Sequence, residues 1–405
     1  MKLLISPWGN FRSWNEVEYI FNGKSRRSKS PILLLYDIIE PDKTIVILPN
    51  TLASDLERAD KEVEGEAKEF LKELGVSAEV LVIPGTGKFP NGEFLGHPTD
   101  AYYYLTYGLS QEIPVEDLEV HLDITHGLNY LTFFTQRALE DILGILAIGK
   151  TVKMTVYNAD PFVKGVERLR VNVIEERNIM ERPVNEKVGK RVLENYSLDS
   201  TEFGKIMAKF KVNSTRLNLW ASSILLGLPL LLATTYPDRA EVLQILDEAL
   251  REFRENIEVQ GNILERKIGL GKDFATLSKL AFQIEVINDL LRDMDLPKEE
   301  LSADELFEIA ERVFKGRIRE STKVEVNRIV RKVGDVKEWT KLRTFFPNAT
   351  PQVDPRNFLA HAGLEANLVE VKREGDVLFR YTKDHVLYGG KMKDPWRVIS
   401  EILGG

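Results

Sequence analysis

The chain has 405 residues, enough for two or three domains, and combines 43% hydrophobic with 29% charged residues. Its formal net charge of −8 argues against a protein coated in nucleic acid by long-range attraction alone, although a local basic pocket can sit on an acidic body. The absence of cysteine excludes disulfide bonds and thiolate metal sites.

Two apolar segments bear on export and membranes. The opening MKLLISP is too short an apolar run for a secretory signal peptide, so we expect a cytoplasmic protein. The segment Leu217–Ala233 approaches the apolar length of a membrane span. Pro229 and three polar residues inside it favour a buried core helix instead, and we expect no membrane association.

Strand and helix patterns alternate along roughly the first 175 residues. Strands are expected at Lys2–Ser6, Thr44–Leu48, Ala78–Ile83, Leu118–Ile124 and Lys153–Asn158. Helical or turn segments are expected at Pro31–Tyr36, Ala53–Leu74, Asp100–Leu109 and Leu128–Ile148. Continuous apolar strands separated by helices predict an α/β domain with a mostly parallel, Rossmann-like sheet covered on both faces.

Ligands of such sheets bind beyond the carboxyl ends of the strands. Four segments stand at or just after predicted strand ends: Ser6–Asn10, Asn50–Thr51, Pro84–Lys88 and Asp123–Gly127. They are therefore candidate binding segments. The glycine-containing stretch Gly85–Lys88 lacks the full P-loop pattern, so we do not expect ATP hydrolysis.

From about Asn178 the pattern becomes almost entirely helical. Amphipathic helices are expected over Val242–Leu264, Phe274–Met294 and Ala303–Phe314. Near the C-terminus, Leu368–Val371 and Val377–Thr382 flank a turn at Gly375 and predict a β-hairpin. The second half is thus expected to be an all-α-rich domain with a small C-terminal hairpin.

The segment VDPRNFLAHAGLE, Val353–Glu365, is the most informative in this half. Asp354 is expected to cap a helix whose first position is Pro355. Asn357 and His361, four residues apart, would then share one face of that helix.

The residue types in this helix suit cleavage of RNA without a metal. His361 can take a proton from a ribose 2′-hydroxyl or give one to the departing 5′-oxygen. Arg356 can stabilise phosphate charge by bidentate contact, and Asn357 can orient the phosphate or the imidazole. On the residues alone a structural role for the histidine stays open, because a lone histidine is commonly a hydrogen-bonding core residue.

A second polar segment, His121–Asn129, lies between a predicted strand and a long predicted helix. Thr125, His126 and Asn129 can offer hydrogen bonds to a phosphate or a base near free N–H groups. The alternative is a satisfied turn in which Asp123 and Thr125 cap the helix. Both interpretations fit the residues.

Both segments resemble motifs of one family. RNFLAH resembles the Arg-x4-6-His motif of HEPN ribonucleases, and the stretch from Asp123 to Gly127 resembles the Asp-x-Thr-His-Gly motif of CARF domains, the sensors of type III CRISPR systems. SPWGN, Ser6–Asn10, is similar to the loop after the first CARF strand. The whole chain resembles the CARF–HEPN ribonucleases of the Csx group.

The resemblance implies a cytoplasmic, metal-independent endoribonuclease of antiviral defence that cleaves single-stranded RNA and is activated by a cyclic oligoadenylate, most often the four-adenylate ring. It implies a homodimer or higher oligomer that is functionally linked to a type III CRISPR effector complex. The implied catalytic residues are Arg356, Asn357 and His361. The implied ligand contacts are Ser6, Trp8, Asn10, Asn50, Thr51, Thr125, His126 and Asn129.

The implied domains are a CARF sensor over residues 1–177, a helical linker over 178–270 and a HEPN nuclease over 271–405. Within the linker, Lys205–Trp220 could form a helix-turn-helix. No metal is expected, because His97, His121 and His385 have no second ligand at metal spacing. Two rival functions remain: a ligand-responsive CARF regulator that binds DNA, and a non-catalytic scaffold for a CRISPR complex.

Overall fold

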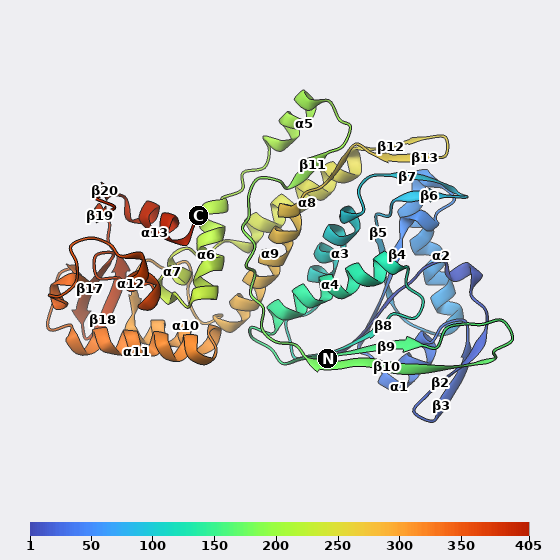
Figure 1. Ribbon diagram of the computed structural model, residues 1–405, viewed down its shortest axis with the longest axis horizontal. Coiled ribbons are helices and arrows are strands. Elements are labelled where there is room, and N and C mark those ends of the chain that lie inside the picture. The colour runs from blue at the N-terminus through green and yellow to red at the C-terminus, as the bar shows by residue number, and fades with distance from the viewer. Residues whose placement is uncertain (405) are drawn as a thin grey trace. The chain divides into compact units, whose positions relative to one another are not determined.

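The computed structural model describes residues 1–404 and divides the chain into two compact units (Figure 1). The first is formed by Met1–Arg182, Arg191–Lys211 and Leu243–Phe282, and the second by Pro183–Lys190, Val212–Val242 and the residues from Gln283 onward. Residues 178–270 therefore contribute to both units. Their role as a linker, and the domain bounds at 177 and 270, stay predictions.

An eight-stranded sheet with the order β3-β2-β10-β9-β8-β1-β4-β5 is the main element of the first unit. Its strands are β1 (Lys2–Pro7), β2 (Val17–Phe21), β3 (Lys24–Ser28), β4 (Lys43–Pro49), β5 (Glu79–Ile83), β8 (Leu118–Asp123), β9 (Val152–Ala159) and β10 (Arg168–Asn178). The neighbours β5, β4, β1, β8 and β9 run parallel, and β10 pairs with β9 in the antiparallel direction. The predicted parallel-rich sheet is confirmed.

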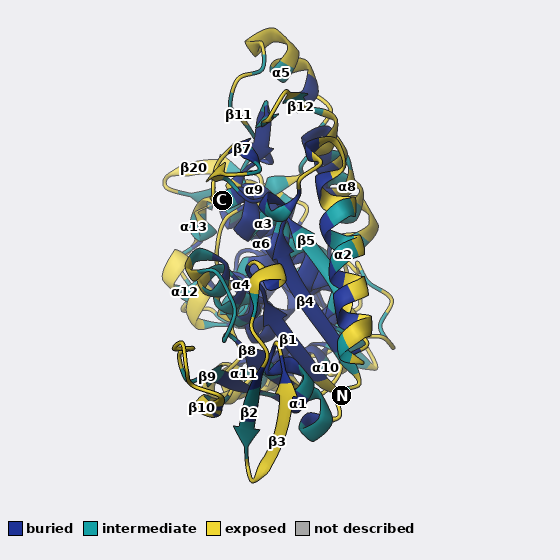
Figure 2. Ribbon diagram, turned by 90° about the vertical axis from the view of Figure 1, so that its right-hand side faces the viewer, coloured by how far each residue is buried: buried dark blue, intermediate teal, exposed yellow. Residues whose placement is uncertain are grey.

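Helices cover both faces of this sheet. They are α1 (Ile32–Ile39), α2 (Ala59–Leu74), α3 (Thr99–Glu112) and α4 (Asn129–Leu146). Leu4 and Val46 pack with α1 and α2 in one apolar core. On the other face, α3 approaches Leu81 so closely that a Cβ on Gly108 would lie 2.9 Å from its side chain. Figure 2 shows the buried strands β1 and β4 between α2 and α4.

The strand order reverses at β1, with β4 and β5 on one side of it and β8 and β9 on the other. In open α/β sheets, ligands bind outside the carboxyl ends of the strands at such a reversal. The segments Ser6–Asn10 and Asp123–Gly127 follow the two strands at this point, β1 and β8. The topology therefore brings two of the four candidate binding segments to the position where a ligand is expected.

The sequence pattern did not predict β2, β3 and β10 of the eight-stranded sheet, nor six further strands of the first unit. These six are β6 (Gly87–Phe89), β7 (Gly92–Leu95), β11 (Leu193–Asn195), β12 (Ile257–Gln260), β13 (Ile263–Arg266) and β14 (Ile268–Leu270). The predicted helix over Val242–Leu264 is wrong beyond Glu255, where α8 (Arg239–Glu255) ends. β12 alternates apolar and polar residues before a turn at Gly261 (φ +62°), and this period of two is typical of a strand.

The second unit is rich in helices and carries a small sheet. Its helices are α6 (Ser214–Leu226), α7 (Pro229–Thr234), α10 (Ala303–Val313), α11 (Gly316–Lys332), α12 (Pro355–Ala360) and α13 (Pro395–Leu403). A four-stranded sheet has the order β15 (Leu301–Ser302), β18 (Asp376–Tyr381), β17 (Val369–Glu374), β16 (Thr340–Lys341), and β19 (Val386–Tyr388) pairs with β20 (Lys391–Lys393). The predicted hairpin is confirmed as β17 and β18 around Gly375.

Two helices, α8 and α9 (Lys272–Leu290), contribute residues to both units. The segment considered for a helix-turn-helix runs from the end of α5 (Ser200–Met207) in the first unit to α6 in the second.

The apolar segment Leu217–Ala233 forms two buried helices instead of the single core helix that we expected. α6 ends at Gly227 (φ +68°), where a left-handed residue closes the helix, and Pro229 begins α7. Among residues 1–404, no helix is both long and apolar enough to cross a membrane.

Candidate functional site

The segment around the candidate catalytic residues begins as the sequence predicts. Asp354 caps α12, and its carboxylate accepts a hydrogen bond from the Arg356 amide at 2.8 Å, with Pro355 in the first helical turn. The helix has only six residues, and His361 is the residue that ends it. The expectation that His361 lies within the helix is therefore corrected. The next two residues, Ala362 at φ +53° and Gly363 at φ +78°, have left-handed backbone conformations. A right-handed α-helix cannot continue through them.

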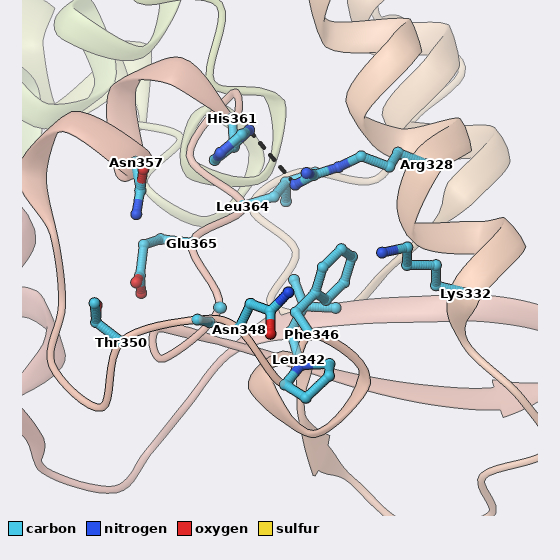
Figure 3. Close-up of a pocket in the computed structure, with 13 residues that line it drawn as sticks. Arg328, Lys332, Leu342, Phe346, Asn348, Thr350, Asn357, His361, Leu364 and Glu365 are labelled. Atoms are coloured by element: carbon cyan, nitrogen blue, oxygen red, sulfur yellow. Dashed lines mark hydrogen bonds between the residues drawn. The ribbon is translucent and has the colours of Figure 1, made fainter.

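Asn357 and His361 nevertheless line the same cavity, whose volume is about 220 Å³. Figure 3 shows their side chains above those of Asn348 and Phe346, with Arg328 and Lys332 reaching in from α11. Arg356 is not among the lining residues. It is exposed, and its guanidinium makes no hydrogen bond to any part of the chain that the structure describes. The structure thus brings two of the three candidate catalytic side chains together.

The imidazole of His361 is held by a carboxylate that the sequence analysis did not single out. Its Nδ1 lies 3.1 Å from Glu325 Oε1 and 3.5 Å from an Arg328 nitrogen. Arg328 also lies 2.9 Å from the other oxygen of Glu325. The shorter contact, together with this ion pair, assigns the Nδ1 proton to the bond with Glu325. Nε2 is then left for chemistry.

A buried network fixes the loop that forms the other side of the cavity. The carboxylate of Glu365 accepts hydrogen bonds from the backbone N–H of Asn367 at 2.7 Å and of Leu368 at 3.1 Å. Asn367 Nδ2 in turn donates to the carbonyls of Thr350 and Gln352, both at 3.1 Å. Burial raises the pKa of Glu365, and these donors favour its charged form. The cavity is therefore walled by a fixed loop.

The α11 residues of this site leave one signal in the sequence. Glu325, Arg328 and Lys332 are spaced by three and four residues, which places them on one face of a helix. Their spacing alone does not separate a functional face from an ordinary solvated one. Only the fold shows that this face meets the loop that carries His361.

In the first unit, the four candidate binding segments meet at the carboxyl edge of the sheet. The Gly9 amide donates to the His126 carbonyl at 2.8 Å, which joins the loops after β1 and β8. The Gly85 amide donates to Asn50 Oδ1 at 2.9 Å, which joins the loops after β5 and β4. Gly85 also approaches Thr51 so closely that a Cβ would lie 2.6 Å from its methyl group. Strand ends far apart in sequence therefore form one surface.

Four of the candidate ligand residues are buried in this edge. Trp8 is fully buried, packs against Phe70 and donates its indole N–H to Ser6 Oγ at 3.0 Å. Ser6 Oγ in turn donates to the Asp123 carboxylate at 3.1 Å. Asn50 and Thr51 are buried as well. These side chains shape the loops in this structure rather than presenting polar atoms to solvent.

The other four are accessible. Asn10 and Asn129 are exposed, and Thr125 and His126 are half-buried. Thr125 donates its amide and hydroxyl to the Asp123 carboxylate at 3.0 and 2.6 Å, as in the satisfied-turn interpretation. The eight candidate ligand residues thus divide into four with accessible side chains and four with buried side chains.

The ring of His126 is held by two aromatic residues. It stacks on Trp14 with a centroid distance of 4.0 Å, and the Tyr19 hydroxyl lies 3.1 Å from its Nε2. Burial lowers the pKa of His126 to about 4, so the imidazole is neutral at physiological pH.

A residue from a distant segment completes this edge. The guanidinium of Arg266, on β13, is buried and donates to the Gly85 carbonyl at 2.9 Å and to Asn50 Oδ1 at 3.4 Å. Its Nε has no hydrogen-bond partner among residues 1–404. The buried carboxylate of Asp100 interacts with it electrostatically and accepts a hydrogen bond from the Tyr196 hydroxyl at 3.0 Å. The sequence pattern gave no signal for Arg266.

Within residues 1–404, no group of three or more His, Cys, Asp or Glu side chains is arranged to hold a metal ion.

Comparisons with known proteins match a stretch of each half of the chain. Residues 3–161 match the family model described as "CRISPR system endoribonuclease Csx1, CARF domain", and residues 311–383 match the HEPN domain model of the same description. A protein of Methanocaldococcus jannaschii named CRISPR system endoribonuclease Csx1 is 34% identical over 413 aligned positions. The alignment covers 91% of this chain and 86% of that protein.

Proposed function

The chain belongs to the Csx1 family of CRISPR system endoribonucleases, and from this premise we propose that it is an endoribonuclease that cleaves single-stranded RNA without a metal when a cyclic oligoadenylate is bound. One observation carries the proposal of metal-free cleavage: His361 lies in a cavity with its Nδ1 on the buried carboxylate of Glu325 and its Nε2 unassigned to any structural bond. An imidazole oriented in this way can transfer protons at neutral pH.

The proposed reaction is an attack within the RNA strand. The 2′-oxygen bonds to the adjacent phosphorus and passes its proton to Nε2 of His361. The bond from phosphorus to the 5′-oxygen breaks, and that oxygen takes up a proton from an imidazolium. The products are a 2′,3′-cyclic phosphate and a free 5′-hydroxyl, so that atoms and protons balance without a metal or an external cofactor.

Cationic side chains supply the charge stabilisation in this scheme. Arg328 lines the cavity of its own chain, whereas Arg356 is exposed and does not line it. We propose that the chain acts as a homodimer in which the exposed Arg356 of each copy contacts the phosphate of a shared cleft. Guanidinium groups suit the phosphate because they bind two of its oxygens at once. Asn357 is proposed to orient the phosphate.

The proposed activator is a cyclic oligoadenylate, most suitably the four-adenylate ring, bound at the carboxyl edge of the first unit's sheet. A ring with two-fold symmetry fits a two-fold dimer, because each copy then contacts an equivalent half. The accessible Asn10, Thr125, His126 and Asn129 are proposed to contact the ring, and the buried Ser6, Trp8, Asn50 and Thr51 to shape its site. Functionally, the protein is proposed to act beside a type III CRISPR effector complex.

The test is cleavage of a labelled single-stranded RNA in EDTA, with and without cyclic tetra-adenylate. We expect the activator to stimulate cleavage by the wild type and His361→Ala to abolish it. His385→Ala is the matched control, because His385 is exposed in the same unit and does not line the cavity. Absence of cleavage with every ring size by folded dimeric protein would refute the proposal, and equal cleavage by the two variants would refute the role of His361.

A further inference from the structure

The floor of the His361 cavity is an aromatic ring beneath two cations. The Arg328 guanidinium carbon lies 4.9 Å and the Lys332 ammonium 4.6 Å from the centroid of the Phe346 ring. Both cations come from successive turns of α11, and Figure 3 shows Arg328 between the ring and His361 and Lys332 to the side of the ring. Lys332 has no carboxylate within ion-pairing distance among residues 1–404. Its charge is therefore available to an anion.

Polar groups without structural partners complete the same cavity. The Asn348 side chain is exposed, and its amide makes no hydrogen bond to any residue from 1 to 404. In Figure 3 this amide points into the cavity beside Phe346. Leu342 and Leu364 add apolar surface around the ring. The cavity thus offers an apolar and aromatic floor, a free amide and an ammonium that no carboxylate neutralises.

We infer that this cavity is a subsite for one nucleotide of the RNA next to the cleaved phosphate, in which the base displaces the exposed Lys332 ammonium from the Phe346 ring, the base edge meets Asn348, and the phosphate meets Arg328 and Lys332. The inference rests on the proposed function and deepens it. Proteins that bind single-stranded RNA stack unpaired bases on aromatic rings and hydrogen-bond the base edges, while Lys and Arg hold the backbone. A volume of about 220 Å³ is smaller than the roughly 300 Å³ and more of sites for larger ligands, which favours a single base.

The structure also gives the subsite a position relative to the reaction. Arg328 contacts both the Phe346 ring and the Glu325–His361 pair. A base against Phe346 therefore places its own backbone beside His361, with one guanidinium between them. Occupation of the subsite would fix the attacked phosphate, so it determines both affinity for RNA and the base next to the cleaved bond.

The test measures RNA binding and cleavage separately in the full-length protein. Binding uses a labelled single-stranded RNA whose 2′-hydroxyls are methylated, which cannot be cleaved by the proposed reaction. We expect Phe346→Ala to weaken binding about tenfold and to raise the KM for cleavable RNA by the same factor, and Phe346→Tyr to restore both. Asn348→Ala is expected to change the distribution of bases at cleavage sites in a random RNA pool. Asn327→Ala, at an exposed position of α11 outside the cavity, is the matched control and is expected to change neither.

Unchanged binding and unchanged base distribution in both Phe346→Ala and Asn348→Ala would overturn the inference. If Phe346→Ala lowers the melting temperature, RNA binding is measured instead with Lys332→Ala, which changes an exposed residue. Weaker RNA binding with a smaller salt dependence would support the subsite, and binding equal to that of the wild type would overturn it. A wild type that binds the methylated RNA through Phe346 yet cleaves no RNA would refute the proposed nuclease but not the subsite. The two failures are therefore distinguishable.

Discussion

The carboxylate of Glu325 and the imidazole of His361 form a 3.1 Å contact between the middle of α11 and the residue that ends α12. Glu325 is buried, and His361 is partly exposed. A buried carboxylate on one ring nitrogen and an accessible second nitrogen together define which nitrogen can react. Glu325 thus acts on the proposed chemistry through His361 and is a positioning residue.

Replacing this carboxylate tests that role. We expect Glu325→Gln to lower kcat for RNA about tenfold to a hundredfold, because the neutral amide no longer fixes the tautomer or stabilises the imidazolium. The KM for RNA should change little. Glu320→Gln is the control, since Glu320 is exposed on the same helix and pairs with Arg319. Equal kcat values for the two variants would remove Glu325 from the mechanism.

The lowered pKa of the half-buried His126 predicts how the stability of the fold depends on pH. Its pKa is about 4 in the folded protein and about 6.5 in an unfolded chain, so the unfolded state binds more protons between these values. The stabilisation is fully present above pH 6.5 and is lost as the pH falls toward 4. Urea unfolding monitored by tryptophan fluorescence should show this loss. His126→Phe, which keeps a ring against Trp14, should show a smaller one, and identical pH profiles would contradict the prediction.

Two of the proposed ligand residues, Asn129 and Trp8, differ in solvent exposure and should therefore respond differently to substitution. Asn129 is exposed, and loss of one hydrogen bond to the activator is worth about 1.5 kcal/mol. Asn129→Ala should therefore raise the concentration of cyclic tetra-adenylate needed for half-maximal RNA cleavage about tenfold, at an unchanged melting temperature. Trp8→Ala removes a fully buried aromatic side chain and should destabilise the protein by about 3–5 kcal/mol. A stable Trp8→Ala variant that fails only in activation would show that the indole contacts the ligand.

The backbone after His361 is sensitive to an added methyl group. Gly363 has φ +78°, and a Cβ there would lie 3.1 Å from the Tyr381 hydroxyl. We expect Gly363→Ala to cost about 1–2 kcal/mol of stability and to lower cleavage by displacing His361. Gly375→Ala is the matched control, because Gly375 has φ +82° with open space around it. Both variants should have lower melting temperatures than the wild type, and only Gly363→Ala should have a lower kcat for RNA cleavage.

The buried guanidinium of Arg266 is expected to stabilise the first unit. Arg266→Met leaves the Gly85 carbonyl without its donor and the buried Asp100 without a nearby positive charge, at a cost of about 3 kcal/mol. Lys267→Met, at the next residue, breaks only the surface pairs with Glu258 and Glu265 and should cost less than about 1 kcal/mol. Chemical denaturation of both variants measures the difference. If Arg266→Met were as stable as the wild type, the buried guanidinium would not be needed for the stability of the first unit.

Local patterns carried most of the predictable structure. The parallel strands, the cap at Asp354 and the hairpin around Gly375 each follow from a few neighbouring residues, and each is confirmed. A further local signal went unused: Asn22 and Gly23, at φ +50° and +76°, form the two-residue turn between β2 and β3. Asn-Gly favours such a turn, and it directly follows the strand-like stretch VEYIF, so the turn was predictable although the polar β3 carries no apolar pattern.

The missing parts of both sites come from contacts between distant residues. Arg266 meets Asn50, and Glu325 meets His361, across segments whose packing no local period describes. The sequence pattern identified His361 as a candidate and could not indicate the carboxylate that orients it. The same limit explains why Trp8 and Asn50, predicted as ligand contacts by position, turned out to be buried.

The first unit is built from three separate segments of the chain, and this affects the order in which its parts are synthesised. Residues up to Arg182 leave the ribosome well before Leu243–Phe282, the stretch that supplies β13 and Arg266. The Gly85 carbonyl and Asn50 Oδ1 therefore cannot accept hydrogen bonds from Arg266 until most of the chain has been synthesised. A gene truncated after residue 182 would encode the sheet without the side chain that closes its carboxyl edge. Transplanting the first unit onto another protein would require a graft that includes the later stretch.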